Sequence, residues 1–166
     1  LEIQYTAHNG TDWSAGTKEL WEFNAAKLQT LHEKHTLSNS NWTITLREIK
    51  GYDAANNNDL IENYALQSNV WKGTKKEQYV FNSAKKKTSS IVYTWFNGAW
   101  ANSTKETWEF NGPSAKQTLH EKYSWSNNAW LITLQENLGY DAAGNNTSIE
   151  NYSYTNGVQK GTKKEE

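Results

Sequence analysis

Cysteine and methionine are absent from this chain, and proline occurs once. Without cysteine, the chain can form neither a disulfide framework nor a thiolate metal site. Tryptophan and tyrosine, by contrast, occur nine times each, although the hydrophobic share of the sequence is only 36%. Abundant tryptophan, tyrosine and threonine with almost no proline are typical of a β-sheet protein, here with its apolar surface concentrated in a few large side chains.

The chain also lacks an excess of charge of either sign, because 17 basic and 18 acidic residues give a net charge of −1. This balance argues against the basic surface of a nucleic-acid-binding protein and against a polybasic membrane anchor. A run of three lysines at residues 85–87 falls on an expected turn, where we interpret it as a solvated loop. No apolar stretch approaches the length of a membrane span. We therefore expect no nucleic-acid partner and no membrane insertion.

Residues 90–110 contain the clearest structural signal. The dipeptide Asn97-Gly98 separates two alternating segments, and it favours a hairpin because a type I′ turn needs positive φ at both central residues. Folding about this turn places Trp95 opposite Trp100. The corresponding turns of other hairpins are Asn39-Ser40, Ser68-Asn69, Asn127-Asn128 and Asn156-Gly157.

One face of these hairpins is expected to be aromatic and to form the core of the sheet. Strand alternation places Glu106, Trp108 and Phe110 on the same face as Trp100. Burying one tryptophan or tyrosine removes roughly 150–250 Å² from solvent, so we expect the sheet to coil until its aromatic face turns inward. The expected structural aromatic core is Tyr93, Trp95, Trp100, Trp108, Phe110, Tyr123, Trp130 and Tyr140.

The hairpin pattern recurs with a period of 29 or 30 residues. The tryptophan that follows the turn occurs at Trp13, Trp42, Trp71, Trp100 and Trp130. A longer repeat overlies the short one, because Leu31 of an LHEK motif returns at Leu119 and Gly73 of a GTKKE motif returns at Gly161, each 88 residues later. A fixed period is typical of an array. We interpret residues 1–166 as one continuous array and expect it to be a fragment of a longer protein. The repeats cover approximately residues 1–30, 31–60, 61–89, 90–118, 119–148 and 149–166.

These repeats predict an all-β fold, an antiparallel meander of about six β-hairpins in a single coiled or spiral sheet with an aromatic inner face. The connections between hairpins begin with asparagine or aspartate directly after an aromatic residue, as an Asx-turn requires. The connections begin at Asn24, Asp53, Asn82, Asn111 and Asp141.

Two columns of glutamate raise the question of catalysis. Carboxylate pairs can perform acid–base chemistry when their environments separate their pKa values. An enzyme needs one asymmetric site, however, and these acids recur like the structural residues. We therefore expect no enzymatic activity and no catalytic residue, and we expect the glutamates to accept hydrogen bonds from tyrosine hydroxyls, tryptophan N–H or loop amides of the next strand. The columns are Glu19, Glu48, Glu77, Glu106, Glu136 and Glu165, and Glu33, Glu62, Glu121 and Glu150.

Three segments could suggest a metal site. In the segment His-Glu-Lys-His, His32 and His35 are three residues apart, so on a strand they point to opposite faces. The loops at residues 53–59 and 141–146 are rich in oxygen ligands that suit calcium, but they lack spaced carboxylates and a bidentate glutamate. Turn chemistry is the better interpretation of these loops. We expect no metal and no cofactor.

The aromatic columns are also a candidate binding platform, since tryptophan and tyrosine stack on sugar rings and nucleobases. The core interpretation is favoured because the columns recur in every repeat. Exposed tryptophans could still bind glycans, and the candidates are Trp21, Trp108 and Trp125.

The segments GYDAANN from Gly51 and GYDAAGN from Gly139 look like the Tyr-Asp turn of YD/Rhs-type repeats. The wider pattern over residues 100–111, a tryptophan followed by Lys-Glu and then Trp-Glu-Phe-Asn, is similar to β-hairpin repeats of large secreted surface proteins of Bacteroidetes-type bacteria. The resemblance implies an extracellular β-hairpin array that serves as a shell, a stalk or an adhesive surface.

Together these patterns predict a non-enzymatic structural or adhesive repeat segment of a secreted or cell-surface protein. Its expected partners are neighbouring repeats or other copies of the chain, and bare strand edges would allow copies to join into filaments. One alternative is a carbohydrate-binding module that holds surface glycans with exposed tryptophan or tyrosine. A second alternative is a shell segment of a YD/Rhs-type toxin.

Overall fold

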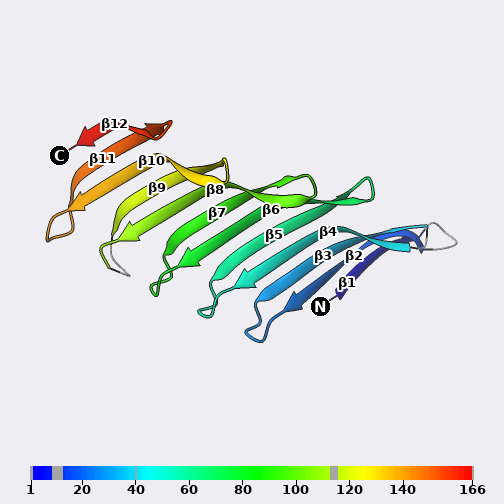
Figure 1. Ribbon diagram of the computed structural model, residues 1–166. Coiled ribbons are helices and arrows are strands. Elements are labelled where there is room, and N and C mark those ends of the chain that lie inside the picture. Colours follow the sequence, from blue (N-terminus) through cyan, green and yellow to red (C-terminus); the bar gives the residue numbers. More distant parts are fainter. Residues whose placement is uncertain (1, 9–12, 40, 113–115, 166) are drawn as a thin grey trace. The chain divides into compact units, whose positions relative to one another are not determined.

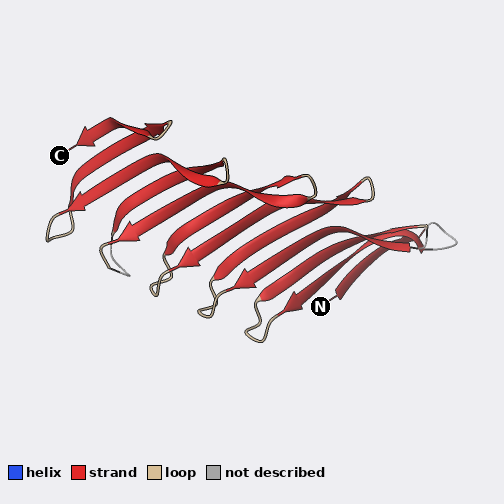
Figure 2. Cartoon of the chain, viewed as in Figure 1, coloured by secondary structure: helices blue, strands red, loops and turns tan. Residues whose placement is uncertain are grey.

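The computed structural model describes residues 2–8, 13–39, 41–112 and 116–165, with the backbone alone for residues 2–8 and 13–15. Every regular element in this part of the chain is a β-strand (Figures 1 and 2). The strands are β1 (Glu2–His8), β2 (Trp13–Phe23), β3 (Gln29–Ser38), β4 (Asn41–Tyr52), β5 (Asn58–Gln67), β6 (Val70–Phe81), β7 (Lys87–Phe96), β8 (Ala99–Phe110), β9 (Gln117–Ser126), β10 (Ala129–Tyr140), β11 (Asn146–Thr155) and β12 (Val158–Glu165). Accordingly, the described ranges contain no helix long and apolar enough to cross a membrane.

The strands lie in one sheet in the order of the sequence, from β1 to β12 (Figure 1). The pairs with a described register, such as β3 with β4 and β9 with β10, are antiparallel. Short turns produce this arrangement, because a two-residue loop returns the chain in the opposite direction. The prediction of an all-β antiparallel meander in a single sheet is confirmed, and the sheet is open.

The chain forms two compact units. We call Leu1–Glu77 with Thr94–Ala101 unit 1, and Gln78–Tyr93 with Asn102–Glu166 unit 2. Strands β1 to β5 belong to unit 1 and strands β9 to β12 belong to unit 2.

Two-residue turns with positive φ join the strands within the hairpins. Asn97 and Gly98 have φ angles of 49° and 81°, as a type I′ turn requires. The predicted turns at residues 68–69, 127–128 and 156–157 also have positive φ at both positions and are confirmed. In the remaining predicted turn Asn39 has positive φ, whereas residue 40 lies outside the described residues.

Longer loops join successive hairpins, and an initial aspartate or asparagine organises each described loop. Asp53 Oδ1 accepts hydrogen bonds from the backbone N–H of Ala55 at 2.8 Å and of Asn57 at 2.9 Å. The side chains of Asn24, Asn82 and Asp141 accept equivalent bonds. The loop after Asn111 includes residues 113–115, which lie outside the described residues. The Asx-turn prediction is confirmed for the other four loops.

One residue of each described loop adopts a left-handed conformation, and this residue offers a test of loop strain. The residue is Gly144, with φ of 80°, in one loop and Lys27, with φ of 62°, in another. This conformation costs a residue with a Cβ atom about 1–2 kcal/mol, which glycine avoids at the expense of greater freedom in the unfolded chain. We expect Lys27→Gly to raise the free energy of unfolding by about 0.5–1 kcal/mol and Gly144→Ala to lower it by about 1 kcal/mol. Urea denaturation measures both changes, and a less stable Lys27→Gly variant would contradict the prediction.

A β-bulge interrupts the second strand of at least three hairpins. In β10 the register with β9 shifts between Ile132 and Leu134, so Thr133 is an extra residue. The same shift surrounds Thr45 in β4 and Thr162 in β12. An extra residue moves all later side chains of its strand to the opposite face of the sheet.

A threonine hydroxyl fixes the backbone at the position of the bulge. In four strands, a threonine Oγ1 donates a hydrogen bond of 3.1 or 3.2 Å to the backbone carbonyl 11 residues earlier. The threonines are Thr45, Thr74, Thr133 and Thr162. This hydrogen bond gives the hydroxyl a partner within the neighbouring strand, which stabilises the irregular register.

The bulge makes the prediction of a single aromatic face wrong. Trp130 pairs with Trp125, whereas Glu136 pairs with His120 on the other side of β9. Trp108 also pairs with His120, so Trp108 and the glutamate column do not share the face of Trp130. Of the expected core residues that unit 2 contributes from β8 to β10, Tyr123 and Trp130 lie on one face and Trp108, Phe110 and Tyr140 lie on the other.

Each unit therefore presents two aromatic faces, which we name the ladder face and the stack face. The ladder face carries Glu33, His35, Arg47 and Tyr64 in unit 1, and Glu121, Tyr123, Trp130 and Tyr152 in unit 2. The stack face carries Trp21, His32 and Glu48 in unit 1, and Trp108, His120 and Glu136 in unit 2. Among the side chains that the structure describes, Leu37 and Glu33 are buried, each 8% exposed, and no large one is fully buried.

Candidate functional site

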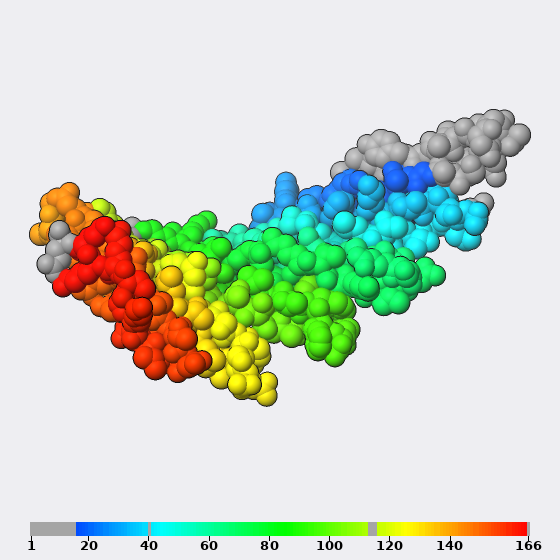
Figure 3. Space-filling view, turned by 90° about the horizontal axis from the view of Figure 1, so that it is seen from above, coloured from blue at the N-terminus to red at the C-terminus, as the bar shows by residue number. Residues whose placement is uncertain are grey.

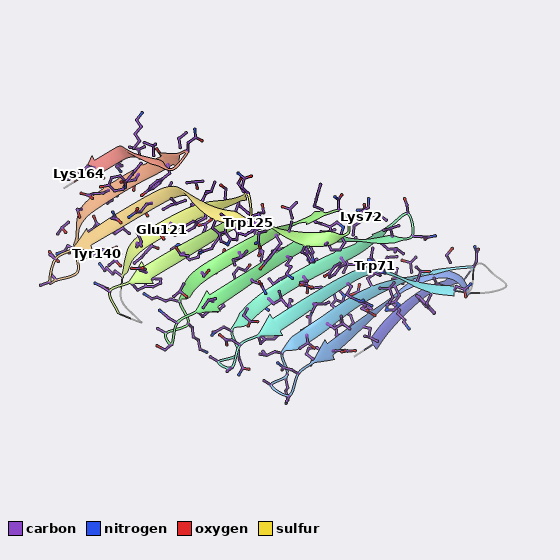
Figure 4. The ribbon with its side chains drawn as sticks, in the orientation of Figure 1. Trp71, Lys72, Glu121, Trp125, Tyr140 and Lys164 are labelled. Atoms are coloured by element: carbon purple, nitrogen blue, oxygen red, sulfur yellow. The ribbon has the colours of Figure 1, made fainter. Side chains whose placement is uncertain are left out.

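The ladder face repeats one interaction, in which a glutamate binds the ring of the residue two positions later. The hydroxyl of Tyr64 donates a hydrogen bond of 2.8 Å to Glu62 Oε2, and the hydroxyl of Tyr152 donates one of 2.8 Å to Glu150 Oε2. The other pairs are Glu121 with Tyr123 and Glu33 with His35. Three glutamates of this column thus accept hydrogen bonds from tyrosine hydroxyls, as expected, but each tyrosine lies on the same strand as its glutamate and not on the next strand, so that part of the prediction is wrong. Figure 4 labels Glu121 on β9.

A cation from the next strand completes the interaction. In unit 1, Nη2 of Arg47 lies 2.6 Å from Oε1 of Glu33, and Nζ of Lys76 lies 2.6 Å from Oε1 of Glu62. The guanidinium carbon of Arg47 also lies 5.5 Å from the ring centroid of Trp71, which Figure 4 labels on β6. The ladder thus alternates anions, cations and aromatic rings, and cation–π contacts add to the ion pairs.

The ladder fixes the protonation state of its members. Burial raises the pKa of the Glu62 carboxyl, but the hydrogen bonds from Lys76 and Tyr64 and the charge of Lys76 outweigh burial and hold this pKa below its usual value. Burial raises the pKa of the Tyr64 hydroxyl, and its hydrogen bond to Glu62 adds to the increase. Glu62 is held charged and Tyr64 neutral, so neither is adjusted toward the near-neutral pKa that suits a general acid or base.

Tyr123 gives a pH-dependent test of the ladder. Burial, together with the hydrogen bond to Glu121 and the charge of that carboxylate, raises the pKa of Tyr123 to about 12. An unfolded tyrosine has a pKa of about 10. The higher pKa in the folded chain means that the neutral hydroxyl of Tyr123 stabilises the fold. This stabilisation is complete below pH ~10 and is lost as the pH rises from ~10 to ~12. We expect the difference in tyrosinate absorbance between the wild type and Tyr123→Phe to titrate near pH 12, and to titrate lower in a Glu121→Gln background. Titration near pH 10 in both backgrounds would contradict the assignment.

On the stack face, a glutamate holds a histidine flat against a tryptophan. In unit 1 the rings of Trp21 and His32 are 5.1 Å apart and inclined by 4°. The Nε2 atom of His32 lies 3.0 Å from Oε2 of Glu19. This arrangement covers one side of the tryptophan ring and orients the histidine.

Unit 2 contains the same arrangement beside a hollow. The rings of Trp108 and His120 are 5.2 Å apart and inclined by 7°, and Nε2 of His120 lies 2.7 Å from Oε2 of Glu106. A hollow of about 440 Å³ adjoins Trp108. It is lined by Asn82, Thr88, Trp108, Glu109, Phe110 and Gly112. An aromatic surface beside polar side chains suits a small polar ring.

The structure separates the three candidate glycan-binding tryptophans. Trp21 and Trp108 lie on the stack face, each against a histidine. Trp125 packs edge to face against Trp130 on the ladder face, with ring centroids 5.0 Å apart. Trp108 and Trp125, both of unit 2, therefore lie on opposite faces and do not form one binding platform.

The residues of the predicted metal motif also separate. His32 binds Glu19 on the stack face, and His35 binds Glu33 on the ladder face. Within the described ranges, no group of three or more histidine, aspartate or glutamate side chains could hold a metal ion.

Unit 1 contains a tryptophan cluster built over a glycine. The rings of Trp95 and Trp100 meet edge to face at 5.0 Å, and Nε1 of Trp100 donates a hydrogen bond of 3.0 Å to the hydroxyl of Tyr64. A Cβ atom at Gly73 would lie 2.3 Å from Trp100 and 2.5 Å from Trp95. Only glycine leaves room for both rings.

Two features of the ladder were not anticipated from the sequence. A column of cations, with Arg47 and Lys105 as members, lies on the ladder face, and in β4 the bulge at Thr45 places Arg47 there. The recurrence of threonine three residues after the turn tryptophan, at Thr45 and Thr133, was a visible sign of that bulge.

No protein-family model matches the chain, and no curated protein matches it. A protein of unknown function from Bacteroides fragilis is similar in structure, with a TM-score of 0.46 and 12% identity over 81% of this chain and 90% of that chain. A DUF3836 family protein from Bacteroides vulgatus gives a TM-score of 0.27 and 13% identity over 69% of this chain and 90% of that chain. A porin-like protein from Bacteroides uniformis gives a TM-score of 0.25 and 9% identity over 98% of this chain and 92% of that chain. None of the three is described as a YD or Rhs repeat protein, so that resemblance stays a prediction.

Proposed function

We propose that the chain is a non-enzymatic structural or adhesive repeat segment of a secreted or cell-surface protein. The observation that supports this proposal is the recurrence of one ladder interaction in both units, at Glu62–Tyr64 and at Glu150–Tyr152. A catalytic site departs from the pattern around it, whereas these carboxylates repeat and act as hydrogen-bond acceptors.

The exposed apolar side chains support a role in contact with other surfaces. Phe96 at a hairpin turn is 66% exposed, and Leu131 in β10 is 50% exposed. Apolar groups on an accessible sheet face are available for contact with other chains or with host surfaces. A coiled array with a 29–30 residue period would present such groups at regular intervals.

Antibody labelling of the source cells tests the proposed location. We expect an antibody against the chain to label intact cells as strongly as permeabilised cells. Labelling that appears only after permeabilisation would contradict a surface or secreted location.

A carbohydrate-binding module is the second candidate, and the hollow beside Trp108 is the observation that favours it. A sugar ring could stack on the free side of this tryptophan while Asn82 and Glu109 supply polar contacts at the hollow. Under this hypothesis, Trp108→Ala abolishes binding on a glycan array and Trp125→Ala retains it. Failure of the wild-type chain to bind any glycan on the array would exclude the module.

A further inference from the structure

A hollow on the ladder face of unit 1 contains a residue that occurs nowhere else in the chain. The hollow has a volume of about 250 Å³ and is lined by Arg47, Ile49, Tyr64 and Trp71, and we name it the Trp71 hollow. Strands β4 and β5 carry three of these residues and pair with each other, and Figure 3 shows residues of both strands, from cyan to green, on the visible surface. Arg47 is the only arginine of the 166 residues. In a chain built from repeats, a residue that occurs once indicates a local role.

The second copy of this region, 88 residues later in unit 2, keeps the framework and changes the lining. The segment VWKGTKKE at residues 70–77 returns as VQKGTKKE at residues 158–165, with glutamine in place of tryptophan as the single difference. Three of the four lining residues become amides in the second copy. The replacements are Gln135 for Arg47, Asn137 for Ile49 and Gln159 for Trp71. The fourth, Tyr64, returns as Tyr152 with the same hydrogen bond to a glutamate.

The amides of the second copy take part in hydrogen bonds within the fold. Nε2 of Gln135 donates a hydrogen bond of 3.0 Å to Oδ1 of Asn137, and Oε1 of Gln135 accepts one of 2.7 Å from the hydroxyl of Tyr154. The first copy has a guanidinium, an aliphatic side chain and an indole at the corresponding positions. The Trp71 hollow therefore differs from its repeat in the residues that a ligand would touch.

Arg47 uses one edge of its guanidinium for the fold. Nε donates a hydrogen bond of 2.7 Å to Oε1 of Glu33, and Nη2 lies 2.6 Å from the same oxygen. Over the described residues, neither Nη1 of Arg47 nor Nε1 of Trp71 has a hydrogen-bond partner. The edge formed by Nη1 and Nη2 is thus open, and a guanidinium edge binds a carboxylate through two parallel hydrogen bonds.

The acceptors that contact the lining are already occupied. Each oxygen of the Glu33 and Glu62 carboxylates has a partner in unit 1. The hydroxyl of Tyr64 donates to Glu62 and accepts from Trp100. The polar groups left at the hollow are N–H donors, so they favour a ligand that supplies acceptors.

The rest of the lining is apolar and has the size of a single ring. Ile49 and the rings of Tyr64 and Trp71 form this part of the lining, and the guanidinium carbon of Arg47 lies 5.5 Å from the ring centroid of Trp71. An apolar cavity of about 150 Å³ holds benzene. The Trp71 hollow, at about 250 Å³, has room for one six-membered ring and a carboxylate. Apolar walls with a few polar groups are typical of small-molecule sites.

We propose that the Trp71 hollow binds a six-membered ring that carries a carboxylate. The ring packs against Trp71 and Ile49, and the carboxylate accepts hydrogen bonds from the open edge of Arg47. Two sources share this chemistry, a uronic acid residue of an acidic glycan and a free aromatic acid. Such a site goes beyond the proposed structural or adhesive role, and it belongs to unit 1, whereas the hollow beside Trp108 belongs to unit 2.

Nuclear magnetic resonance titration of the full ¹⁵N-labelled chain tests the site. Because the chain has one arginine, a single guanidinium Nε–H signal reports on Arg47. The probes are glucuronate and benzoate, and glucose and benzamide are their neutral analogues. We expect at least one acid to shift this signal and the indole N–H signal of Trp71, and its neutral analogue to bind at least tenfold more weakly because it lacks the charge-assisted hydrogen bonds.

The two acids distinguish the sources of the ligand. Tighter binding of glucuronate would identify an acidic sugar residue as the ligand, and tighter binding of benzoate would identify a free aromatic acid. If neither acid shifted the two signals, or if the acids and their neutral analogues bound equally, the proposal would be overturned.

Three variants test the assigned contacts. Trp71→Gln introduces the residue of the second copy, and Arg47→Lys keeps a positive charge beside Glu33 but removes the open guanidinium edge. We expect each to weaken binding of the acid at least tenfold. Trp42→Gln makes the same change at the turn tryptophan of the preceding hairpin, which does not line the hollow, and is expected to leave binding unchanged.

Circular dichroism of the three variants confirms that they remain folded. Equal effects of Trp71→Gln and Trp42→Gln would show that the Trp71 hollow is not the binding site. A chain that binds neither acid but still labels intact cells would refute this inference and leave the proposed function standing.

Discussion

Replacing Gly73 by alanine is expected to lower the free energy of unfolding by about 3 kcal/mol. The new Cβ atom would lie 2.3 Å from Cζ2 of Trp100 and 2.5 Å from Cε3 of Trp95, whereas carbon atoms in contact are normally about 3.5–4.0 Å apart. Neither ring can move freely, because the two rings pack against each other and Trp100 is hydrogen-bonded to Tyr64. Urea denaturation followed by tryptophan fluorescence measures the loss.

Gly161→Ala is the matched control for this substitution, because the two glycines occupy the same position 88 residues apart. Its Cβ atom would meet Tyr152 at 3.9 Å, and alanine is favoured over glycine within a strand by roughly 0.5–1 kcal/mol. We expect this variant to be as stable as the wild type or slightly more stable. Comparable losses at both glycines would show that the tryptophan cluster is not the cause.

A double-mutant cycle separates the clash from other effects of alanine. Trp100→Ala alone removes a large packed ring and is expected to destabilise the chain by about 3 kcal/mol. In that background Gly73→Ala should cost much less than in the wild type, because one of the two rings it meets is gone. Strictly additive losses would contradict the proposed contact.

The turns and loops could be predicted from the sequence because their causes are local. Asn97-Gly98 adopts positive φ at both positions for reasons that lie within the dipeptide. Asp53 accepts its loop hydrogen bonds from residues two and four positions later in the chain. Once these turns were assigned, the order of the strands followed, since each strand meets the strand next to it in sequence.

The distribution of side chains over the two faces could not be predicted by simple alternation. One extra residue, Thr133 in β10, moves every later side chain of that strand to the opposite face of the sheet. As a result, Glu136 lies on the stack face, although alternation from Trp130 placed it with the aromatic column. The threonine recurs in the sequence, but its meaning depends on a carbonyl of the neighbouring strand, which only the register identifies.

The candidate site shows the same division between local and non-local causes. The bond between Glu121 and Tyr123 joins residues two apart on one strand, so its cause is local, although the repeated pattern was interpreted as bonds to the next strand. The cation–π contact of Lys105 with Tyr123 joins two strands, with the amine 4.6 Å from the ring centroid, and it depends on the register between them. The tryptophan cluster at Gly73 depends on residues still further apart, since Trp100 and Tyr64 are separated by 36 positions.

Replacing Arg47 by methionine is expected to lower the free energy of unfolding by about 2–3 kcal/mol. Glu33 is only 8% exposed, and its Oε1 lies 2.7 Å from Nε and 2.6 Å from Nη2 of Arg47. Methionine keeps much of the apolar stem but removes the charge, so a buried carboxylate loses its counter-ion. Because the arginine side chain is 39% exposed, solvent screening places the loss below the about 3–5 kcal/mol found for fully buried pairs. Chemical denaturation at neutral pH provides the measurement.

Lys164→Met is the matched control for the charge, because Lys164 occupies the same column and faces Glu150 on its ladder face. That pair is 3.7 Å apart, and its side chains are 60% and 33% exposed, so the loss should remain below about 0.5 kcal/mol. Adding Glu33→Gln to Arg47→Met should recover part of the stability, since the buried carboxylate is then neutral. If Arg47→Met and Lys164→Met destabilised the chain equally, or if Glu33→Gln worsened the arginine variant, the stability of the ladder would not depend on its most buried ion pair.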